Sequence, residues 1–282
     1  MSTLPRLVSR KANAERSVSR LRADSSEGTG CEELESVPTE KETRAALARA
    51  ETREAGIKAA LAPAVAAREG ARILVYGRTR WGKSAFARHL VKAALDSGVA
   101  GTVLIHDPKF PDHAQYEGIA VSELSLVGVA VQAGSVVVCR PPMSAADAAH
   151  AARLLSESGE RTLLLCDETR RALGGSQIWC DGKNPDGTPG ERSFEWICLE
   201  GGGLGASLVL LVQRPRQLPG DAVDSAQTHV VFGLGGRSLT YLVTAGTVPP
   251  EAKDTIRRLP PGAFCVFGDD DDWDGKTYYS PE

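Results

Sequence analysis

One stretch of the sequence decides the fold: Gly77-Arg78-Thr79-Arg80-Trp81-Gly82-Lys83-Ser84. It matches the pattern G-x-x-x-x-G-K-[ST] in full and lies between an apolar run, residues 72–76, and a run of helical composition. Glycines in this pattern let backbone N–H groups turn inward around phosphates, at the positive end of the following helix. We therefore predict that all eight residues form a phosphate-binding loop. The alternative is an ordinary glycine-rich turn.

Two side chains of this stretch carry the expected chemistry. The ammonium of Lys83 would supply positive charge to the β- and γ-phosphates, and the hydroxyl of Ser84 would be a ligand of Mg²⁺. The expected cofactors are therefore ATP and Mg²⁺, with Lys83 as a catalytic residue and Ser84 as a metal ligand.

An acidic motif follows downstream, where the apolar run Thr162–Cys166 ends in Asp167 and Glu168. Such a strand delivers an acid to the carboxyl edge of a sheet, and we assign Asp167 to the magnesium shell. Glu168 points differently and is predicted to polarise the attacking water. Strands often end in acids, so the motif gains weight only because it follows a phosphate-binding loop with room for two strand–helix units between. The alternative is a carboxylate pair without a role.

A polar amide ends the next apolar run, where Gln213 follows Ser207–Val212 and precedes Arg214-Pro215. The amide of Gln213 could hydrogen-bond the γ-phosphate or the water and so report which nucleotide is bound. From the chemistry alone, a plain turn residue is an equal alternative.

Short apolar runs alternate with helical stretches from Arg72 onward. The expected strands are Arg72–Tyr76, Thr102–His106, Ser135–Arg140, Thr162–Cys166, Ser207–Val212, His229–Gly233 and Ala263–Phe267, and the expected helices include Lys83–Asp96, Ser144–Ser156 and Arg192–Leu199. Continuous Val, Ile and Leu runs separated by helices predict an α/β fold with a mostly parallel sheet covered on both faces. The run Lys276–Tyr279 after an acidic turn predicts a terminal antiparallel hairpin.

Three regions follow from composition. Residues 1–38 are predicted to be a disordered charged tail, because residues 1–22 hold six basic groups and residues 24–42 hold seven acids without apolar periodicity. One interpretation is a solvated tail without a function, and the alternative is an arm that binds nucleic acid or a partner. Residues 39–69 form a helix and linker: Thr39 and Glu42 fit a capping box, and Pro63 is expected to interrupt the helix after Ala62. Residues 70–282 are predicted to form the ATPase domain.

The overall composition excludes several classes of protein. The net charge of -3 argues against a whole-chain nucleic-acid polyelectrolyte, and no apolar run is long enough to cross a bilayer. The six cysteines show no C-x-x-C spacing, so we expect a reducing cytoplasm and neither disulfides nor a cysteine metal site.

Taken in order, these motifs resemble those of the FtsK–HerA superfamily of DNA-pumping ATPases, a RecA-like group with a glutamate beside the Walker B aspartate. The likeness spans roughly residues 72–268. Beyond the loop it is carried by Asp107-Pro108-Lys109, Gln213-Arg214-Pro215, residues 223–234 and Leu259-Pro260-Pro261-Gly262. The resemblance implies a RecA-like α/β domain and makes Gln213 the expected sensor.

The sequence departs from this family at two positions: Trp81 replaces the usual small residue of the loop, and Val212 replaces the usual Thr before Gln213. The resemblance also implies arginine fingers that act on a neighbouring subunit, for which no motif fixes the position. We take Arg153 and Arg161 as the catalytic candidates; further candidates are Arg214, Arg216 and Arg237.

A long loop, residues 174–192, follows the acidic motif. Loops of this length inside a domain are usually functional or disordered. Lys183 and Arg192 could contact phosphates of a nucleic acid, and Trp179 could stack on a base. The alternative is a surface loop whose Trp179 packs on the domain.

The resemblance implies ATP-driven translocation of double-stranded DNA by a homo-oligomeric ring, with a hexamer favoured. In its small size the chain is most similar to genome-packaging ATPases of tailless icosahedral viruses with internal membranes. That would place it in the host cytoplasm or with the virion, beside a capsid or membrane-vertex protein. The alternatives are a plasmid-transfer or mobile-element ATPase, or a nucleotide-dependent scaffold that does not move DNA.

The composition of residues 1–38 generates a first prediction. A chain that begins at Thr39 should unfold at the same temperature as the full chain in a calorimetric scan, because a tail without apolar periodicity adds no core. A drop of several degrees on truncation would show instead that the tail packs on the domain.

Overall fold

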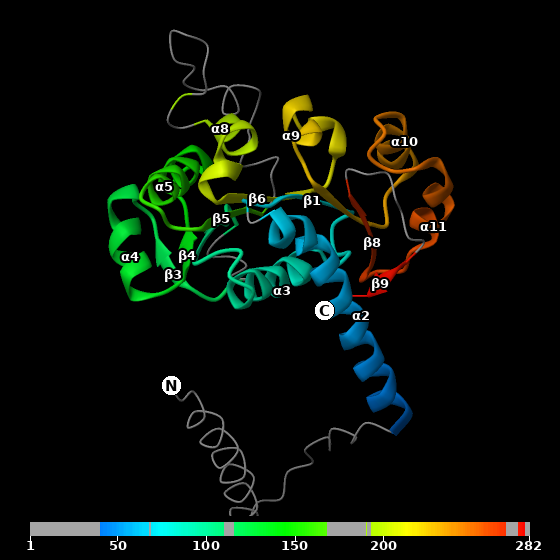
Figure 1. Cartoon of the computed structure of the whole chain (residues 1–282). Coiled ribbons are helices and arrows are strands. Elements are labelled where there is room, and N and C mark those ends of the chain that lie inside the picture. Colours follow the sequence, from blue (N-terminus) through cyan, green and yellow to red (C-terminus); the bar gives the residue numbers. More distant parts are fainter. Residues whose placement is uncertain are drawn as a thin grey trace, which may run out of the picture. The chain divides into compact units, whose positions relative to one another are not determined.

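Strands lie at the centre of the fold (Figure 1), and most of their buried residues are Val, Ile and Leu. The computed structural model describes residues 40–67, 69–109, 116–167, 190, 193–268 and 276–279. Within these residues one sheet has the strand order β3-β4-β2-β5-β6-β1-β7-β8-β9. Its strands are β1 (Arg72–Tyr76), β2 (Thr102–His106), β3 (Ile119–Val121), β4 (Val136–Cys139), β5 (Thr162–Cys166), β6 (Ala206–Val212), β7 (Thr228–Phe232), β8 (Ala263–Gly268) and β9 (Tyr278–Tyr279).

The sheet is parallel from β3 to β7 and antiparallel at its other end. β1 pairs with β6 on one side and β7 on the other, with Val75 opposite Leu211 and Val230. β8 runs antiparallel to β7, and β9 runs antiparallel to β8. The predicted mostly parallel sheet and terminal hairpin are therefore confirmed, while the acidic turn, residues 269–275, lies outside the described residues.

Helices cover both faces of the sheet (Figure 1). The helices are α2 (Glu40–Ala67), α3 (Lys83–Asp96), α4 (Val127–Ala133), α5 (Ala145–Glu157), α8 (Phe194–Leu199), α9 (Gly220–Asp224), α10 (Gly236–Thr244) and α11 (Lys253–Arg258). Residues of α2 and α3 share one hydrophobic core with one face of the strands. Residues of the other six helices share a second core with the opposite face. Adjacent strand residues alternate between these cores, as the pleat requires.

Helix α2 corrects one expectation, because it does not end before Pro63 but continues to Ala67. Proline in a helix interior removes one backbone donor, which usually breaks or kinks the helix. Here Ala60, Leu61 and Ala64 are at most 3% exposed, so the turns on both sides of Pro63 are held by packing. Residues 1–39, including the predicted tail and the capping residue Thr39, lie outside the described residues.

Four cysteines lie in the core on the α5 side of the sheet: Cys139, Cys166, Cys198 and Cys265. All four are free thiols, and burial raises the pKa of Cys139 to about 12. Their core environment is that of small apolar side chains. None of the described helices is long and apolar enough to cross a membrane.

Burial predicts a matched pair of stability effects on two helices. Leu90 on α3 is fully buried, whereas Leu154 on α5 is 50% exposed. Leu90→Ala should lower the free energy of unfolding by about 3–5 kcal/mol, because it leaves a cavity in the core. Leu154→Ala, the same chemical change, should alter it by less than about 1 kcal/mol. Denaturant unfolding measures both, and equal effects would contradict the assigned core.

Candidate nucleotide-binding site

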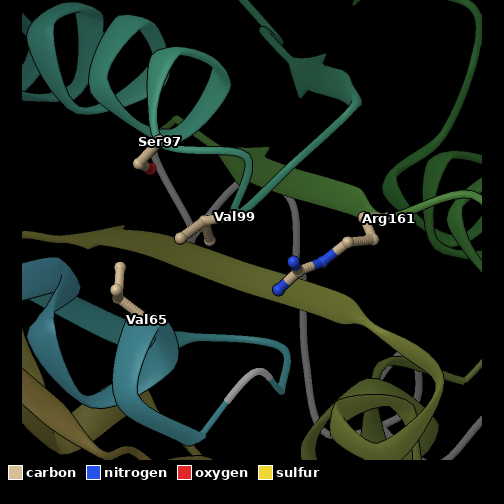
Figure 2. A pocket seen from close by; sticks show the side chains of 4 residues that line it. All are labelled: Val65, Ser97, Val99 and Arg161. Carbon is tan, nitrogen blue, oxygen red and sulfur yellow. The ribbon is translucent and has the colours of Figure 1, made fainter.

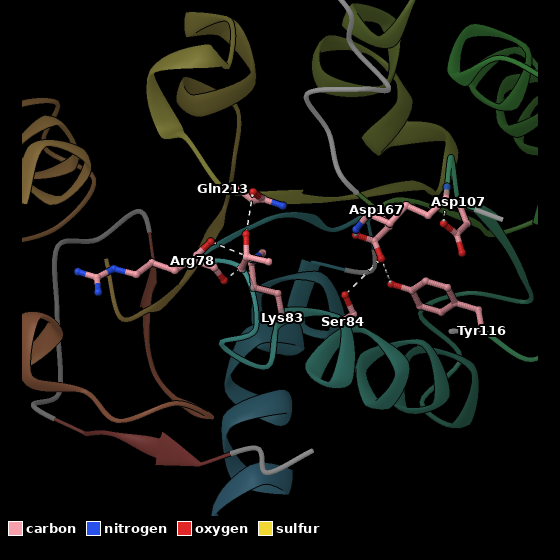
Figure 3. Close-up of polar contacts among 10 residues, drawn as sticks. Arg78, Lys83, Ser84, Asp107, Tyr116, Asp167 and Gln213 are labelled. Carbon is pink, nitrogen blue, oxygen red and sulfur yellow. Dashed lines mark hydrogen bonds and ion pairs between the residues drawn. The ribbon is translucent and has the colours of Figure 1, made fainter. Parts of the chain in front are cut away.

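The parallel strands bring the predicted site residues to one edge of the sheet (Figure 3). The loop after β1 begins at Gly77, Gln213 follows β6, and Asp167 follows β5. In strand order these elements are neighbours, with β6 between β5 and β1. Ligands of open α/β sheets bind at this carboxyl edge, in the crevice where the strand order reverses.

The loop curves tightly around the side chain of Lys83. Gly82 has φ 91°, a left-handed conformation that favours glycine, and Arg80 has φ 62°. The ammonium of Lys83 donates to the carbonyl oxygens of Gly77 at 2.9 Å and Arg78 at 2.8 Å. Lys83 is only 8% exposed, so its charge is held inside the curve of the loop, where phosphates bind in loops of this type.

The two predicted metal ligands meet across the site. Ser84, on the first turn of α3, donates its hydroxyl to Oδ2 of Asp167 at 3.2 Å (Figure 3). Asp167 is 4% exposed. A hydroxyl and a carboxylate are oxygen ligands of the kind that Mg²⁺ prefers, so the residues present fit this ion.

Two further side chains bind Asp167, and neither of them was given a role at the site from the sequence. The hydroxyl of Tyr116 donates to Oδ2 at 3.1 Å, and Nζ of Lys109 lies 3.9 Å from Oδ1. Burial, followed by the nearby charge of Asp167, raises the pKa of Tyr116 well above its usual range, so the phenol stays a hydrogen-bond donor. Lys109 was noted from the sequence only as part of the Asp107-Pro108-Lys109 motif, whereas no motif marks Tyr116.

The backbone after β2 holds Lys109 in place. Asp107 is 1% exposed, and its Oδ1 accepts the N–H of Lys109 at 3.0 Å. A short Asp side chain that bonds the backbone two residues on fixes a tight turn. The resemblance of Asp107-Pro108 to a family motif therefore has a structural counterpart in the turn that directs Lys109 toward Asp167.

The predicted sensor contacts the phosphate-binding loop directly. Oε1 of Gln213 accepts the hydroxyl of Thr79 at 3.2 Å (Figure 3). This bond joins the end of β6 to the exposed part of the loop after β1. The site therefore includes Gln213, while its contact with a γ-phosphate or water stays a prediction.

Other predicted residues lie away from this cluster or outside the described residues. Glu168 lies outside the described residues. The long loop, residues 174–192, lies outside them as well, apart from Gly190. Arg153 on α5 forms an ion pair with Glu157 at 2.7 Å and lies 5.1 Å from the ring centroid of Trp196.

Arg161 lies just before β5, at the sheet edge opposite the loop. It lines a cavity of about 360 Å³ with Val65, Ser97 and Val99 (Figure 2). Arg161 thus lies at the opposite edge of the sheet from this chain's own site, whereas Arg153 contacts Glu157 and Trp196. Their predicted action on a neighbouring subunit stays a prediction.

The described site predicts a role for Tyr116 in metal binding. Tyr116→Phe removes one donor that orients the carboxylate of Asp167. Removing such a partner of a metal ligand costs about tenfold or more in metal affinity. We expect the Mg²⁺ concentration for half-maximal thermal stabilisation by ATPγS to rise about tenfold. Tyr241→Phe, on α10, is the control; an equal Mg²⁺ requirement in both variants would refute the role.

The sequence matches no family model and no curated protein. Its fold is similar to that of the genome packaging NTPase B204 from Sulfolobus turreted icosahedral virus 2 in complex with sulfate. The TM-score is 0.59 at 17% identity, over 76% of this chain and 98% of that chain. The complex with ATP-gammaS gives a TM-score of 0.56 at 17% identity, over 75% and 97% of the two chains.

A related structure is B204, the DNA-packaging ATPase from Sulfolobus Turreted Icosahedral Virus, with a TM-score of 0.56 and 17% identity. That likeness covers 74% of this chain and 97% of that chain. The likeness confirms the predicted fold, an α/β domain built on a mostly parallel sheet.

Proposed function

We propose that the protein hydrolyses ATP and uses the energy to move double-stranded DNA, as the packaging ATPase of a viral genome. One observation carries the ATPase part: Lys83 is held inside the loop, and Ser84 contacts Asp167 at 3.2 Å, with Gln213 on the adjacent strand end. The similarity in fold to B204, the DNA-packaging ATPase from Sulfolobus Turreted Icosahedral Virus, supports the choice of DNA as the substrate that is moved.

Each residue of the site has a role in the proposed reaction. Lys83 would exchange its bonds to the carbonyls of Gly77 and Arg78 for bonds to phosphate oxygens. Ser84 and Asp167 would hold Mg²⁺, which when bound neutralises charge on the phosphates. Gln213 would hydrogen-bond the γ-phosphate or the water, and Glu168 would accept a proton from the water.

The proposed assembly is a homo-oligomeric ring, with a hexamer favoured. Catalysis of phosphoryl transfer needs positive charge beside the transferred group, and a neighbouring subunit can supply it as an arginine finger. Arg153 and Arg161 are the proposed fingers. A capsid or membrane-vertex protein is the proposed partner that holds the ring at the particle, and the proposed location is the host cytoplasm or the virion.

The two central residues should separate binding from chemistry. Lys83→Ala should weaken ATP binding, because it removes the cation of the phosphate site. Glu168→Gln should still bind ATP but turn it over at least about a hundredfold more slowly, because it removes the proposed base. Calorimetric binding and phosphate release measure the two effects. Hydrolysis by Glu168→Gln at the wild-type rate would show that Glu168 is not the base.

Coupling to DNA makes a separate prediction. Double-stranded DNA should raise the turnover of ATP, and added salt should weaken DNA binding, because Lys and Arg side chains displace counterions from phosphates. Turnover measured with and without DNA, beside the oligomer mass in solution, tests this. A protein that stays monomeric with ATP and DNA, and whose turnover ignores DNA, would rule out the motor.

The finger assignments can be tested in mixed rings. Wild-type protein mixed with Arg153→Ala or Arg161→Ala should lose more activity than dilution accounts for, if that residue acts across the interface. Removing such a cation elsewhere lowers turnover by on the order of 10³-fold or more. Activity that falls only in proportion to dilution with both variants would remove these two assignments and leave the ATPase proposal intact.

A further inference from the structure

A large aromatic side chain lies in the middle of the phosphate-binding loop. Trp81 is half-buried and packs against both hydrophobic cores, those on the two faces of the sheet. It immediately precedes Gly82, whose φ of 91° sets the curve of the loop around Lys83. The position of Trp81 therefore bears directly on the shape of the phosphate site.

The indole of Trp81 packs against Gly233, which follows β7. A Cβ atom added to Gly233 would overlap the six-membered ring of Trp81, meeting its Cζ3, Cε3 and Cη2 atoms. Gly233 does not have a positive φ, so its backbone would accept other residues. Glycine is therefore required at this position because the indole leaves no room for a side chain.

A backbone bond and a cation add to this contact. The N–H of Gly262, in the turn before β8, donates to the carbonyl oxygen of Trp81 at 3.4 Å. The guanidinium of Arg78 lies 5.3 Å from the ring centroid of Trp81. The middle of the loop is thus held by the segment after β7 and by the turn before β8, both far along the chain from the loop itself.

The start of the loop is held separately. The N–H of Gly77 donates to the carbonyl oxygen of Val212 at 3.1 Å, at the end of β6. The start of the curve is therefore fixed by β6, and its middle by the residues after β7 and before β8. Between these two points lie the carbonyl oxygens of Gly77 and Arg78 that hold the Lys83 ammonium.

We propose that Trp81 is a positioning residue of the phosphate-binding loop and that Gly233 is its matched partner. This inference rests on the nucleotide binding that the proposed function requires. Trp81 acts through the backbone of Gly82 and the side chain of Lys83, so displacing the indole shifts the loop away from the geometry that receives phosphates. Substitutions of the two residues should consequently have non-additive effects on the affinity for nucleotide.

The test is a double-mutant cycle on Mg²⁺–ATPγS binding, measured by calorimetry beside thermal unfolding without nucleotide. Gly233→Ala should lower the affinity roughly tenfold or more, because the added methyl overpacks the contact. Trp81→Ala should lower it as well. In the Trp81→Ala background, Gly233→Ala should cost nothing further, since the ring it displaces is gone.

The matched control is Gly236→Ala at the start of α10, where an added Cβ meets nothing within 4 Å and the affinity should stay that of the wild type. If Gly233→Ala alone does not fold, the double variant and Trp81→Ala still complete the comparison. Wild-type affinity in Trp81→Ala, or an equal cost of Gly233→Ala in both backgrounds, would overturn the proposal. A wild-type chain that fails to bind Mg²⁺–ATPγS would overturn the proposed function along with it.

Discussion

Parallel pairing at the centre of the sheet is the constraint on which the site depends. β1 pairs with β6 and β7, and β6 pairs with β5, so successive strands point the same way and their carboxyl ends lie at one edge. That alignment brings three segments far apart in sequence within hydrogen-bonding distance, through Ser84 and Asp167 and through Thr79 and Gln213. Each contact is local in space, and none would survive a shift of one strand against the next.

The elements whose bounds were predicted correctly are strands with continuous apolar runs and the helix that follows the phosphate-binding loop. The bounds of β1, β2, β5 and α3 agree with the sequence prediction to the residue. These strands are buried on both faces of the sheet, so their sequences are continuous apolar runs rich in Val, Ile and Leu. Short elements such as β3 and α9 were missed because three or five residues are too few to show a period. The extent of α2 was misjudged because packing of Leu61 and Ala64 outweighs the local effect of Pro63.

The same distinction applies to the candidate site. Lys83, Ser84 and Asp167 could be predicted because fixed spacing within a loop or at a strand end dictates their chemistry. Tyr116 reaches Asp167 across 51 positions of sequence, a contact made by the route of the chain and by no motif. Likewise, Trp81 is visible in the sequence only as a departure from a pattern. Its partner Gly233 is one of 29 glycines, and only the folded chain shows which of them faces the indole.

The distribution of thiols between the two cores has a practical consequence. Cys139, Cys166, Cys198 and Cys265 all belong to the core under α5, α8 and α10, and burial raises the pKa of the first three. Thiolates are the form that alkylating reagents attack, so labelling of these four requires the layer above them to open. The core beneath α2 and α3 contains no cysteine among the described residues. The rate of alkylation at these four thiols therefore reports the opening of that layer, and its comparison with global unfolding shows whether the two sides of the sheet separate together.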